Sequence, residues 1–389
     1  MERIVYMDHA SATSLSPEVK EAMMPYLDEV FWNPSVVYDL GSRVKDAIED
    51  AREKVADLIN AEPDEIVFTS SGAEANNLAI KGIAFANPKK GKRIIVSAIE
   101  HHSVLNSARF FERLGYEVTF LPVDRYGLVD PERLKKAISP DTVLVSIMHA
   151  NNEIGTIEPI KELCEIAHEN GSFFHTDAVA TVGNIPVDVK ELGIDLLSLS
   201  GISLGAPKGT GALYFKKNTR LMPLIHGGIQ ERGRRAGTEN VPGIIGLGKA
   251  AELRVKNLEE RAKKLTSLRD RLIQGVTSSI PKVHFTGHPE KRLPNHASFC
   301  IEGIEGEALI FMLSANNVYA NTGSACASKA LKTSPVLVAI GLSDVVAQGS
   351  VVFTLDESNS PEDVDHVLNV LPQVARRLRE MSPVWKEAA

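Results

Sequence analysis

A serine and glycine stretch at the expected start of a helix has the composition of a phosphate site. Residues 69–77 read Thr-Ser-Ser-Gly-Ala-Glu-Ala-Asn-Asn and follow the apolar run 65–69. The first N–H groups of a helix have no partner within the helix, and hydroxyl side chains beside them add further donors. Ser is also a preferred helix cap, so such a run taken alone is weak support for a ligand. Other binding residues must accompany it.

Three further polar side chains follow apolar runs that are typical of strands. His101 comes after residues 93–97, Asn152 after 142–146, and Asp177 after 172–175. Ligands in a parallel sheet collect at the carboxyl ends of its strands. An aspartate in this position is most often a turn or cap residue, so its place alone does not make it a binding residue.

The three cysteines are odd in number and far apart. Cys164, Cys300 and Cys326 have neither a Cys-x-x-Cys spacing nor a Cys/His ligand spacing, which argues against a disulfide framework or a zinc site. Cys164 and Cys300 are interpreted as small buried side chains. Cys326 lies in a loop of Gly, Ser and Ala, residues 320–328, whose low packing demands would let a reactive thiol move.

The elements that must position these residues alternate between strand and helix patterns. Their near-continuous apolar character predicts strands buried on both faces, in a mostly parallel sheet covered by helices. The expected strands are 65–69, 93–97, 117–121, 142–146, 172–175 and 195–199, and the expected helices are 74–84, 131–137 and 160–168.

The C-terminal part predicts a smaller α+β domain. A charged helix over residues 248–276 leads into strands expected at 297–301, 318–320 and 351–355. A chain of 389 residues is long enough for two or three domains. We expect a large domain over residues 16–256 that binds the ligand, and a small domain of residues 1–15 plus 257–389 that carries the Cys326 loop.

Composition narrows the classes of partner. The hydrophobic fraction of 43% and the charged fraction of 24% are typical of globular proteins, and the net charge of −7 argues against nucleic acid. No run reaches the roughly 18 apolar residues of a membrane span. The first residues also lack the apolar stretch of a secretion signal, so the expected location is the cytoplasm.

Residues 196–209, which read LLSLSGISLGAPKG, resemble a known signature. It ends S-x-H-K-x-x-x-P-K-G in cysteine desulfurases of the NifS/IscS type, which are pyridoxal phosphate (PLP) enzymes of aminotransferase class V. The resemblance runs from Tyr6 to Trp385 and implies a fold-type-I PLP-dependent transferase. Where that family has His-Lys, this chain has Ile202-Ser203. The family's Lys bonds covalently to the cofactor aldehyde, and a serine hydroxyl performs that role poorly.

The resemblance assigns roles to individual residues. Asp177 would face the pyridine nitrogen, His101 would stack on the ring as a catalytic residue, and Asn152 would contact the ring hydroxyl. The implied cofactor-binding set is Gly72, Ala73, His101, Asn152, Asp177, Ser200, Ser203 and Thr238, with Thr238 reaching the phosphate of a neighbouring subunit. The implied substrate-binding residues are Asn33 and Asn152, and the implied nucleophile is Cys326.

Other positions depart from the family pattern. Ala73 replaces a threonine, Ala180 replaces a glutamine, and Tyr38 replaces a histidine. Val352 stands where the family has an arginine that binds the substrate carboxylate. Loss of a bidentate guanidinium removes both charge and orientation at that point. These changes affect cofactor and substrate contacts, whereas the scaffold motifs are retained.

The resemblance implies transfer of sulfur from L-cysteine through a Cys326 persulfide to an iron–sulfur scaffold of the IscU type, by a homodimer. Because of the departures, we expect low activity and noncovalent PLP or pyridoxamine phosphate. One alternative is a binding module in iron–sulfur assembly without turnover. Others are another class-V activity, such as a selenocysteine lyase or an aminotransferase, or an enzyme in which Lys208 supplies the amine.

Overall fold

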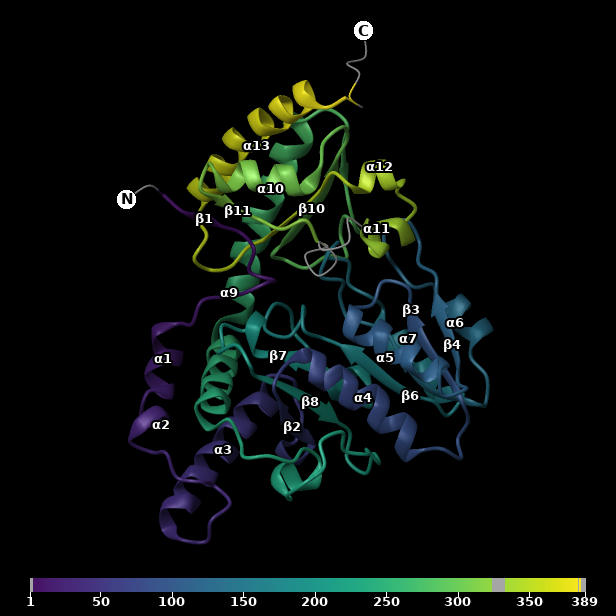
Figure 1. The fold of residues 1–389 in the computed structure, drawn as a ribbon, viewed down its shortest axis with the longest axis vertical. Helices are drawn as coiled ribbons and strands as arrows, with labels where there is room; N and C mark the ends of the chain where they lie inside the picture. The colour runs from purple at the N-terminus through teal and green to yellow at the C-terminus, as the bar shows by residue number, and fades with distance from the viewer. Residues whose placement is uncertain (1–2, 324–332, 384, 386–389) are drawn as a thin grey trace.

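A seven-stranded sheet forms the centre of the larger part of the molecule (Figure 1). The structure is a computed structural model and describes residues 3–323, 333–383 and 385. The strand order is β2-β8-β7-β6-β5-β3-β4, and only β8 runs antiparallel to its neighbours. The strands are β2 (Ile66–Thr69), β3 (Arg93–Ser97), β4 (Glu117–Leu121), β5 (Thr142–Ser146), β6 (Phe173–Asp177), β7 (Leu196–Ser200) and β8 (Gly211–Phe215). The expected mostly parallel sheet is therefore present.

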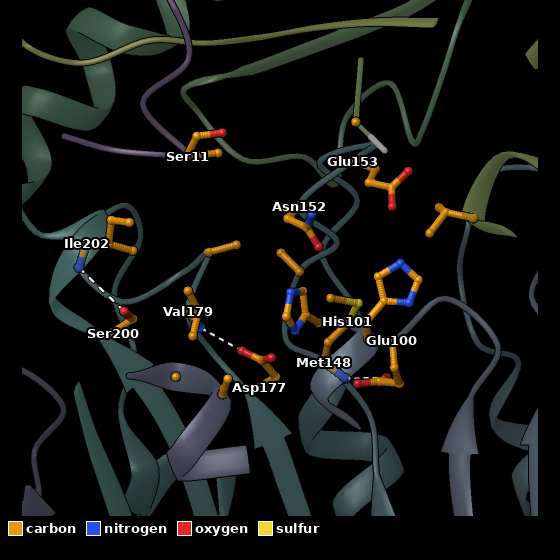
Figure 2. Close-up of a pocket in the computed structure, with 18 of the residues that line it drawn as sticks. Ser11, Glu100, His101, Met148, Asn152, Glu153, Asp177, Val179, Ser200 and Ile202 are labelled. Atoms are coloured by element: carbon orange, nitrogen blue, oxygen red, sulfur yellow. Dashed lines mark hydrogen bonds between the residues drawn. The ribbon is translucent and has the colours of Figure 1, made fainter. Parts of the chain in front are cut away.

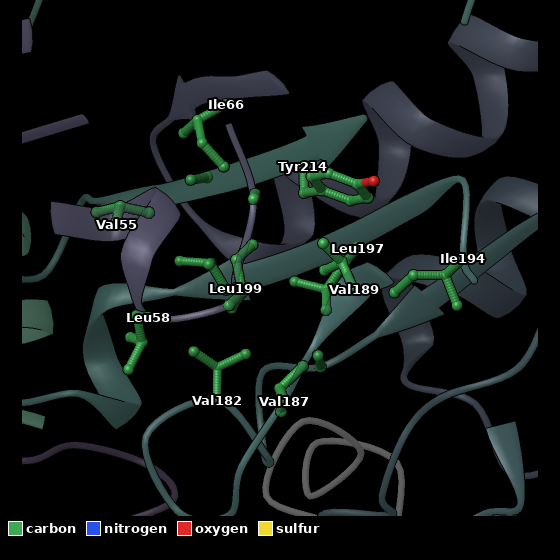
Figure 3. Close-up of a cluster of buried hydrophobic side chains, with 14 of the residues drawn as sticks. Val55, Leu58, Ile66, Val182, Val187, Val189, Ile194, Leu197, Leu199 and Tyr214 are labelled. Carbon is green, nitrogen blue, oxygen red and sulfur yellow. The ribbon is translucent and has the colours of Figure 1, made fainter. Parts of the chain in front are cut away.

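Alternation along the strands places apolar side chains on both faces of this sheet. Ile66 and Phe68 of β2 belong to one buried cluster, whereas Val67 between them belongs to another. Leu197 and Leu199 likewise join Tyr214 in the first cluster (Figure 3). Side chains of a strand point alternately to opposite faces, so both faces need a covering layer.

Helices supply those two layers. Apolar residues of α3 (Asp39–Asp57), α6 (Pro131–Ala137) and α7 (Ile160–Glu169) pack in the first cluster. Those of α4 (Gly72–Ala86) and α5 (His102–Glu112) pack in the second. Short helices α1 (Pro17–Met23), α2 (Pro25–Asp28) and α8 (Val189–Leu192) complete this part.

A smaller assembly lies above the sheet in Figure 1 and has its own core. The core joins Val5 and Met7 near the N-terminus to apolar residues between Leu265 and Ala375. Its strands are β1 (Val5–Tyr6), β9 (Val283–Phe285), β10 (His296–Ile301), β11 (Val318–Tyr319) and β12 (Ser350–Thr354). Its helices are α10 (Gly306–Ser314), α11 (Pro335–Ala339), α12 (Asp344–Ala347) and α13 (Pro361–Met381). Because β1 pairs with β11, the first residues join the C-terminal part.

The long helix α9 (Val241–Ser279) contributes to both cores. It begins seven residues before the expected start at 248, with Asn240 as its cap. The prediction was wrong there because three glycines near this end lower helix propensity. The same glycines permit close packing, since a Cβ on Gly248 would lie 2.6 Å from Ala51 Cα. In the described ranges, no helix is long and apolar enough to cross a membrane.

Candidate active site

A cavity of about 360 Å³ opens at the carboxyl ends of the parallel strands (Figure 2). Residues that follow β2, β3, β5, β6 and β7 line its floor. Its opposite wall comes from Asp8, Ala10 and Ser11, and from Asn321, Gly323 and Val352 of the smaller assembly. We call this the main cavity. It lies where the topology of an α/β sheet places a ligand.

Asp177 ends β6 and lines the main cavity (Figure 2). Asn76 Nδ2 donates to its Oδ2 at 2.6 Å, and the Val179 N–H donates to its Oδ1 at 3.0 Å. Burial raises the pKa of Asp177, and these hydrogen bonds together with the nearby His101 oppose that rise. A cationic ring nitrogen against this carboxylate would favour its charged form.

His101 and Asn152 stand on the same cavity. His101 caps α5, and its Nδ1 accepts from the Ser103 N–H at 3.2 Å. In a neutral ring this leaves Nε2 as the protonated nitrogen. Asn152 is held through its backbone carbonyl, which accepts from His296 Nε2 at 3.0 Å. Both side chains can therefore meet a ligand without losing the contacts that fix them.

The start of α4 forms one end of the main cavity. Ser71 Oγ caps the helix by accepting from the Glu74 N–H at 3.1 Å, and the earlier N–H groups of Gly72 and Ala73 have no partner among the described residues. A Cβ on Gly72 would lie 2.6 Å from Val179 Cγ2, so the position excludes side chains. Ser200, also in the lining, adds a hydroxyl. These donors fit a phosphate group.

The other end of the cavity carries acids instead of donors. The Asp8 carboxylate accepts from Ser11 Oγ at 2.9 Å and from Asn321 Nδ2 at 3.2 Å, and burial raises its pKa. Glu153 accepts from Ser334 Oγ, and burial raises its pKa to about 7. Val352 presents an apolar side chain beside them.

Three of the acids in the lining, Asp8, Glu100 and Glu153, were not predicted from the sequence. Glu100 Oε1 accepts from Ser97 Oγ at 2.5 Å and from the Met148 N–H at 2.8 Å, and burial raises its pKa well above the ordinary value. Glu100 precedes the predicted His101 and Glu153 follows the predicted Asn152, and this adjacency was their only signal in the sequence.

The ionisable side chains that line the main cavity are mainly acidic. Among the described residues, the lining contains four carboxyl groups and two histidines but no lysine or arginine. Lys208, the alternative amine, is exposed and does not line the cavity. The geometry therefore does not support a covalent bond between a ligand in the main cavity and a lysine in the described part of the chain.

Ser203 lies beside a second, smaller cavity of about 50 Å³, which we call the side cavity. It shares Ala10, Asn152, Val179 and Ala180 with the main cavity. Ser203 Oγ donates to the Ser200 carbonyl at 3.1 Å in a 3₁₀ turn, Gly201–Ser203. The two cavities thus meet where the family lysine is expected.

Three predicted residues lie elsewhere or are not described. Asn33 is exposed, and its Oδ1 accepts from the Ser35 N–H at 2.8 Å. Thr238 is exposed between two residues that line a separate pocket. Cys326 lies outside the described residues. Their roles stay predictions.

The residues of the main cavity fit PLP. Asp177 would hold the ring nitrogen, and the start of α4 with Ser200 would hold the phosphate. No group of three or more His, Cys, Asp or Glu residues in the described part of the chain is arranged to hold a metal ion.

Comparison with known proteins agrees with this geometry. Residues 5–367 match the family described as Aminotransferase class-V. "Cysteine desulfurase IscS" of Methanosarcina thermophila is 55% identical over 382 residues, which cover 98% of this chain and 94% of the relative. "Cysteine desulfurase IscS 1" of Archaeoglobus fulgidus is 48% identical over 381 residues, covering 98% and 99% of the two chains.

Solved structures show the same fold. One described as "NIFS-LIKE PROTEIN" has a TM-score of 0.91 at 36% identity and covers 97% of this chain and 100% of its own. "SspA in complex with cysteine" has a TM-score of 0.80 at 36% identity, covering 91% and 99%. The expected PLP fold type I is confirmed. The chain belongs to the class-V aminotransferase family, as a homologue of the NifS/IscS-type cysteine desulfurases, and this membership indicates a PLP-dependent enzyme.

Proposed function

We propose that this protein binds PLP or pyridoxamine phosphate noncovalently in the main cavity and, in the PLP form, transfers sulfur from L-cysteine to Cys326. One observation carries the proposal: a single cavity unites the buried carboxylate of Asp177, the ring of His101 and the free N–H groups that begin α4. The relatives named cysteine desulfurase supply the substrate and the reaction.

Each residue has a defined task in this proposal. A bound PLP supplies an aldehyde for the substrate amine and a ring that withdraws electrons. Asp177 keeps a proton on the ring nitrogen, because its buried carboxylate gains a cationic partner. Gly72, Ala73 and Ser200 hold the phosphate. Asn152 contacts the ring hydroxyl and the substrate, and His101 covers the ring face.

The proposed reaction is slow. Ser203 takes the place of the lysine that would bond to the cofactor and move protons, and Val352 takes the place of the arginine that would bind the substrate carboxylate. A positioned thiolate still attacks an electrophilic sulfur without either residue. The same two changes favour a second candidate, a module for iron–sulfur assembly that binds cofactor without turnover.

The proposed unit is a cytoplasmic homodimer of two-domain subunits, divided at residues 16 and 256. Several large apolar side chains support a subunit contact because they are exposed, among them Phe31, Val37 and Ile229. Thr238 would reach the phosphate in the partner subunit. The proposed sulfur acceptor is an iron–sulfur scaffold of the IscU type.

Mass spectrometry of the Cys326 peptide tests the reaction. The protein is incubated with PLP and L-cysteine, quenched with an alkylating agent and digested. We expect one added sulfur atom on Cys326 that requires PLP, no such adduct in Cys326→Ala, and an unchanged adduct in the control Cys164→Ala. Absence of a PLP-dependent adduct after prolonged incubation would contradict the proposed sulfur transfer. The iron–sulfur assembly module would then be the remaining candidate.

A further inference from the structure

The side cavity is lined by apolar residues such as Leu293 and Leu355 and by several polar residues that have no other task in the proposed reaction. Its volume of about 50 Å³ exceeds the roughly 15 Å³ that one water molecule needs. His9, Asn295 and Ser203 lie in its lining. A space of this size that polar side chains reach, next to a reaction site, can hold ordered water.

His9 has unusual surroundings for a buried histidine. Its residue is 7% exposed, yet neither ring nitrogen has a hydrogen-bond partner among the described residues. Asn295 Oδ1, which is also buried, has no partner either. A buried polar atom is costly when it is left unpaired, and ordered water commonly satisfies it. His296 Nδ1, in the same lining, is also buried and unpaired, so the unpaired atoms of His9, Asn295 and His296 together indicate water.

The backbone and one edge of His9 are fixed. The His9 N–H donates to the Thr354 carbonyl at 3.3 Å, and Thr13 Oγ1 donates to the His9 carbonyl at 3.1 Å. The ring contacts Tyr6 edge to face, with 4.9 Å between centroids. These contacts anchor the residue without using its ring nitrogens.

The charged groups around His9 shift its pKa in opposite directions. Burial lowers the pKa of His9; Asp356, the nearby Tyr6 backbone carbonyl and Asp8 raise it, and Arg261 lowers it. Arg261 Nη2 donates to Asp356 at 2.5 Å, and Arg254 also pairs with Asp356, so most of this charge is balanced. A neutral imidazole offers one donor and one acceptor to the cavity.

We propose that the side cavity binds ordered water, and that this water carries protons between His9 and the main cavity while Ser203 Oγ accepts a hydrogen bond from it and holds it in place. The inference rests on the proposed function, since it supplies the proton transfer for which the family uses its lysine. Ser203 Oγ donates to the Ser200 carbonyl, which leaves its lone pairs free to accept from water. The proton leaves the substrate α-carbon, passes through water to the imidazole, and returns, so the cycle is balanced.

The first test uses protein without cofactor. A high-resolution crystal structure is expected to show water within hydrogen-bond distance of both a His9 ring nitrogen and Asn295 Oδ1. Nitrogen-15 NMR is expected to show a neutral His9 ring whose pKa lies below the ordinary value. A dry side cavity, or a ring that is already cationic at pH 7, would overturn the proposal.

The second test measures exchange of the α-hydrogen of L-alanine in D₂O with added PLP, because alanine carries no sulfur. His9→Asn, which does not titrate near neutral pH, should slow exchange by about 10²-fold or more and remove a limb of the pH profile. Its dissociation constant for PLP should stay within twofold. His284→Asn, which lines neither cavity, should behave as wild type.

The outcomes separate this inference from the proposed function. Exchange in His9→Asn within twofold of wild type, or an unchanged pH profile, would overturn the relay and leave the cofactor site standing. Wild-type protein that binds PLP without any exchange would overturn it as well. Wild-type protein that shows no PLP absorbance after dialysis and no affinity in titration would overturn the proposed function, and the relay with it.

Discussion

The two ends of the main cavity differ in how well their side chains match the chemistry expected of the family. At the cofactor end, Asp177, Gly72 and Ser200 stand on strand ends and a helix start of the large sheet, and each has the chemistry that a phosphate and a pyridine ring require. At the reaction end, Asp8 and Val352 stand on segments of the smaller assembly, Glu153 follows β5 of the large sheet, and no described lysine or arginine faces the cavity. We therefore expect cofactor binding and turnover to be separable in this molecule.

The difference follows from how each end is built. The cofactor end binds the phosphate partly through backbone N–H groups at the start of α4, which a side-chain substitution does not remove. By resemblance to the family, the reaction end depends on a lysine and an arginine side chain. A single substitution removes the function of either one. Changes at Ser203 and Val352 are accordingly compatible with an intact cofactor site.

The largest effect is expected for Asp177→Asn. The variant keeps the shape of the side chain but loses the charge that faces the ring nitrogen, so PLP should bind at least about 100-fold more weakly. Absorbance titration with PLP measures this. Asp188→Asn, at the half-buried cap of α8, which does not line the main cavity, is the control and should bind PLP normally. A change of less than threefold in Asp177→Asn would remove the carboxylate from the cofactor site.

The reaction end should respond to pH through Glu153. Burial raises its pKa from 4.5 to about 7, so the folded state favours the protonated carboxyl. The stabilisation is complete below pH 4.5 and is lost as pH rises through 7, which amounts to about 3 kcal/mol. Urea unfolding of cofactor-free protein should show wild type losing this much relative to Glu153→Gln between pH 4 and pH 8. If the free energies of unfolding of wild type and Glu153→Gln changed with pH in parallel, this expectation would be contradicted. Glu259→Gln, on the exposed side of α9, serves as control.

Val352→Arg should restore a carboxylate partner at the reaction end. We expect the affinity of PLP-loaded protein for L-cysteine to rise by about tenfold, because a guanidinium can bind the carboxylate with two hydrogen bonds. Val352→Leu keeps the apolar character and should leave the affinity unchanged. An unchanged affinity in a folded Val352→Arg protein would show that other groups bind the carboxylate.

Ser200→Ala should produce a smaller loss at the cofactor end. One hydroxyl donor to the phosphate disappears while the N–H groups of α4 remain, so PLP should bind about fivefold to tenfold more weakly. Pyridoxal, which lacks the phosphate, provides the matched ligand control. Equal losses for PLP and pyridoxal would place Ser200 away from the phosphate.

The smallest effect is expected for Cys164→Ala. Burial raises the pKa of the Cys164 thiol to about 12, so the thiolate is scarce even beside His168. Iodoacetamide at pH 8 should leave Cys164 unmodified in the folded protein, and sulfur transfer to Cys326 should change less than twofold. Rapid alkylation of Cys164 would show that this region opens.

The sequence predicted the parallel strands of the large sheet well, but it missed the antiparallel strand β8 and the buried acids. β3, β4 and β5 have the expected bounds, because β-branched runs between polar residues leave little ambiguity. The start of α9 was missed because packing against Ala51 overrides the low helix propensity of Gly248. The acids Glu100 and Glu153 were missed because burial is a property of packing, which a glutamate in the sequence does not reveal. His9 was missed for the same reason.

Peptide mapping after borohydride reduction tests the central claim most directly. Reduction fixes any carbon–nitrogen bond between PLP and a lysine, and the mapped peptide identifies that lysine. The account predicts no phosphopyridoxyl lysine in wild type, although PLP is bound, and a modified peptide at position 203 in Ser203→Lys. A phosphopyridoxyl group on Lys208, Lys329, Lys332 or any other lysine of the wild-type chain would contradict it.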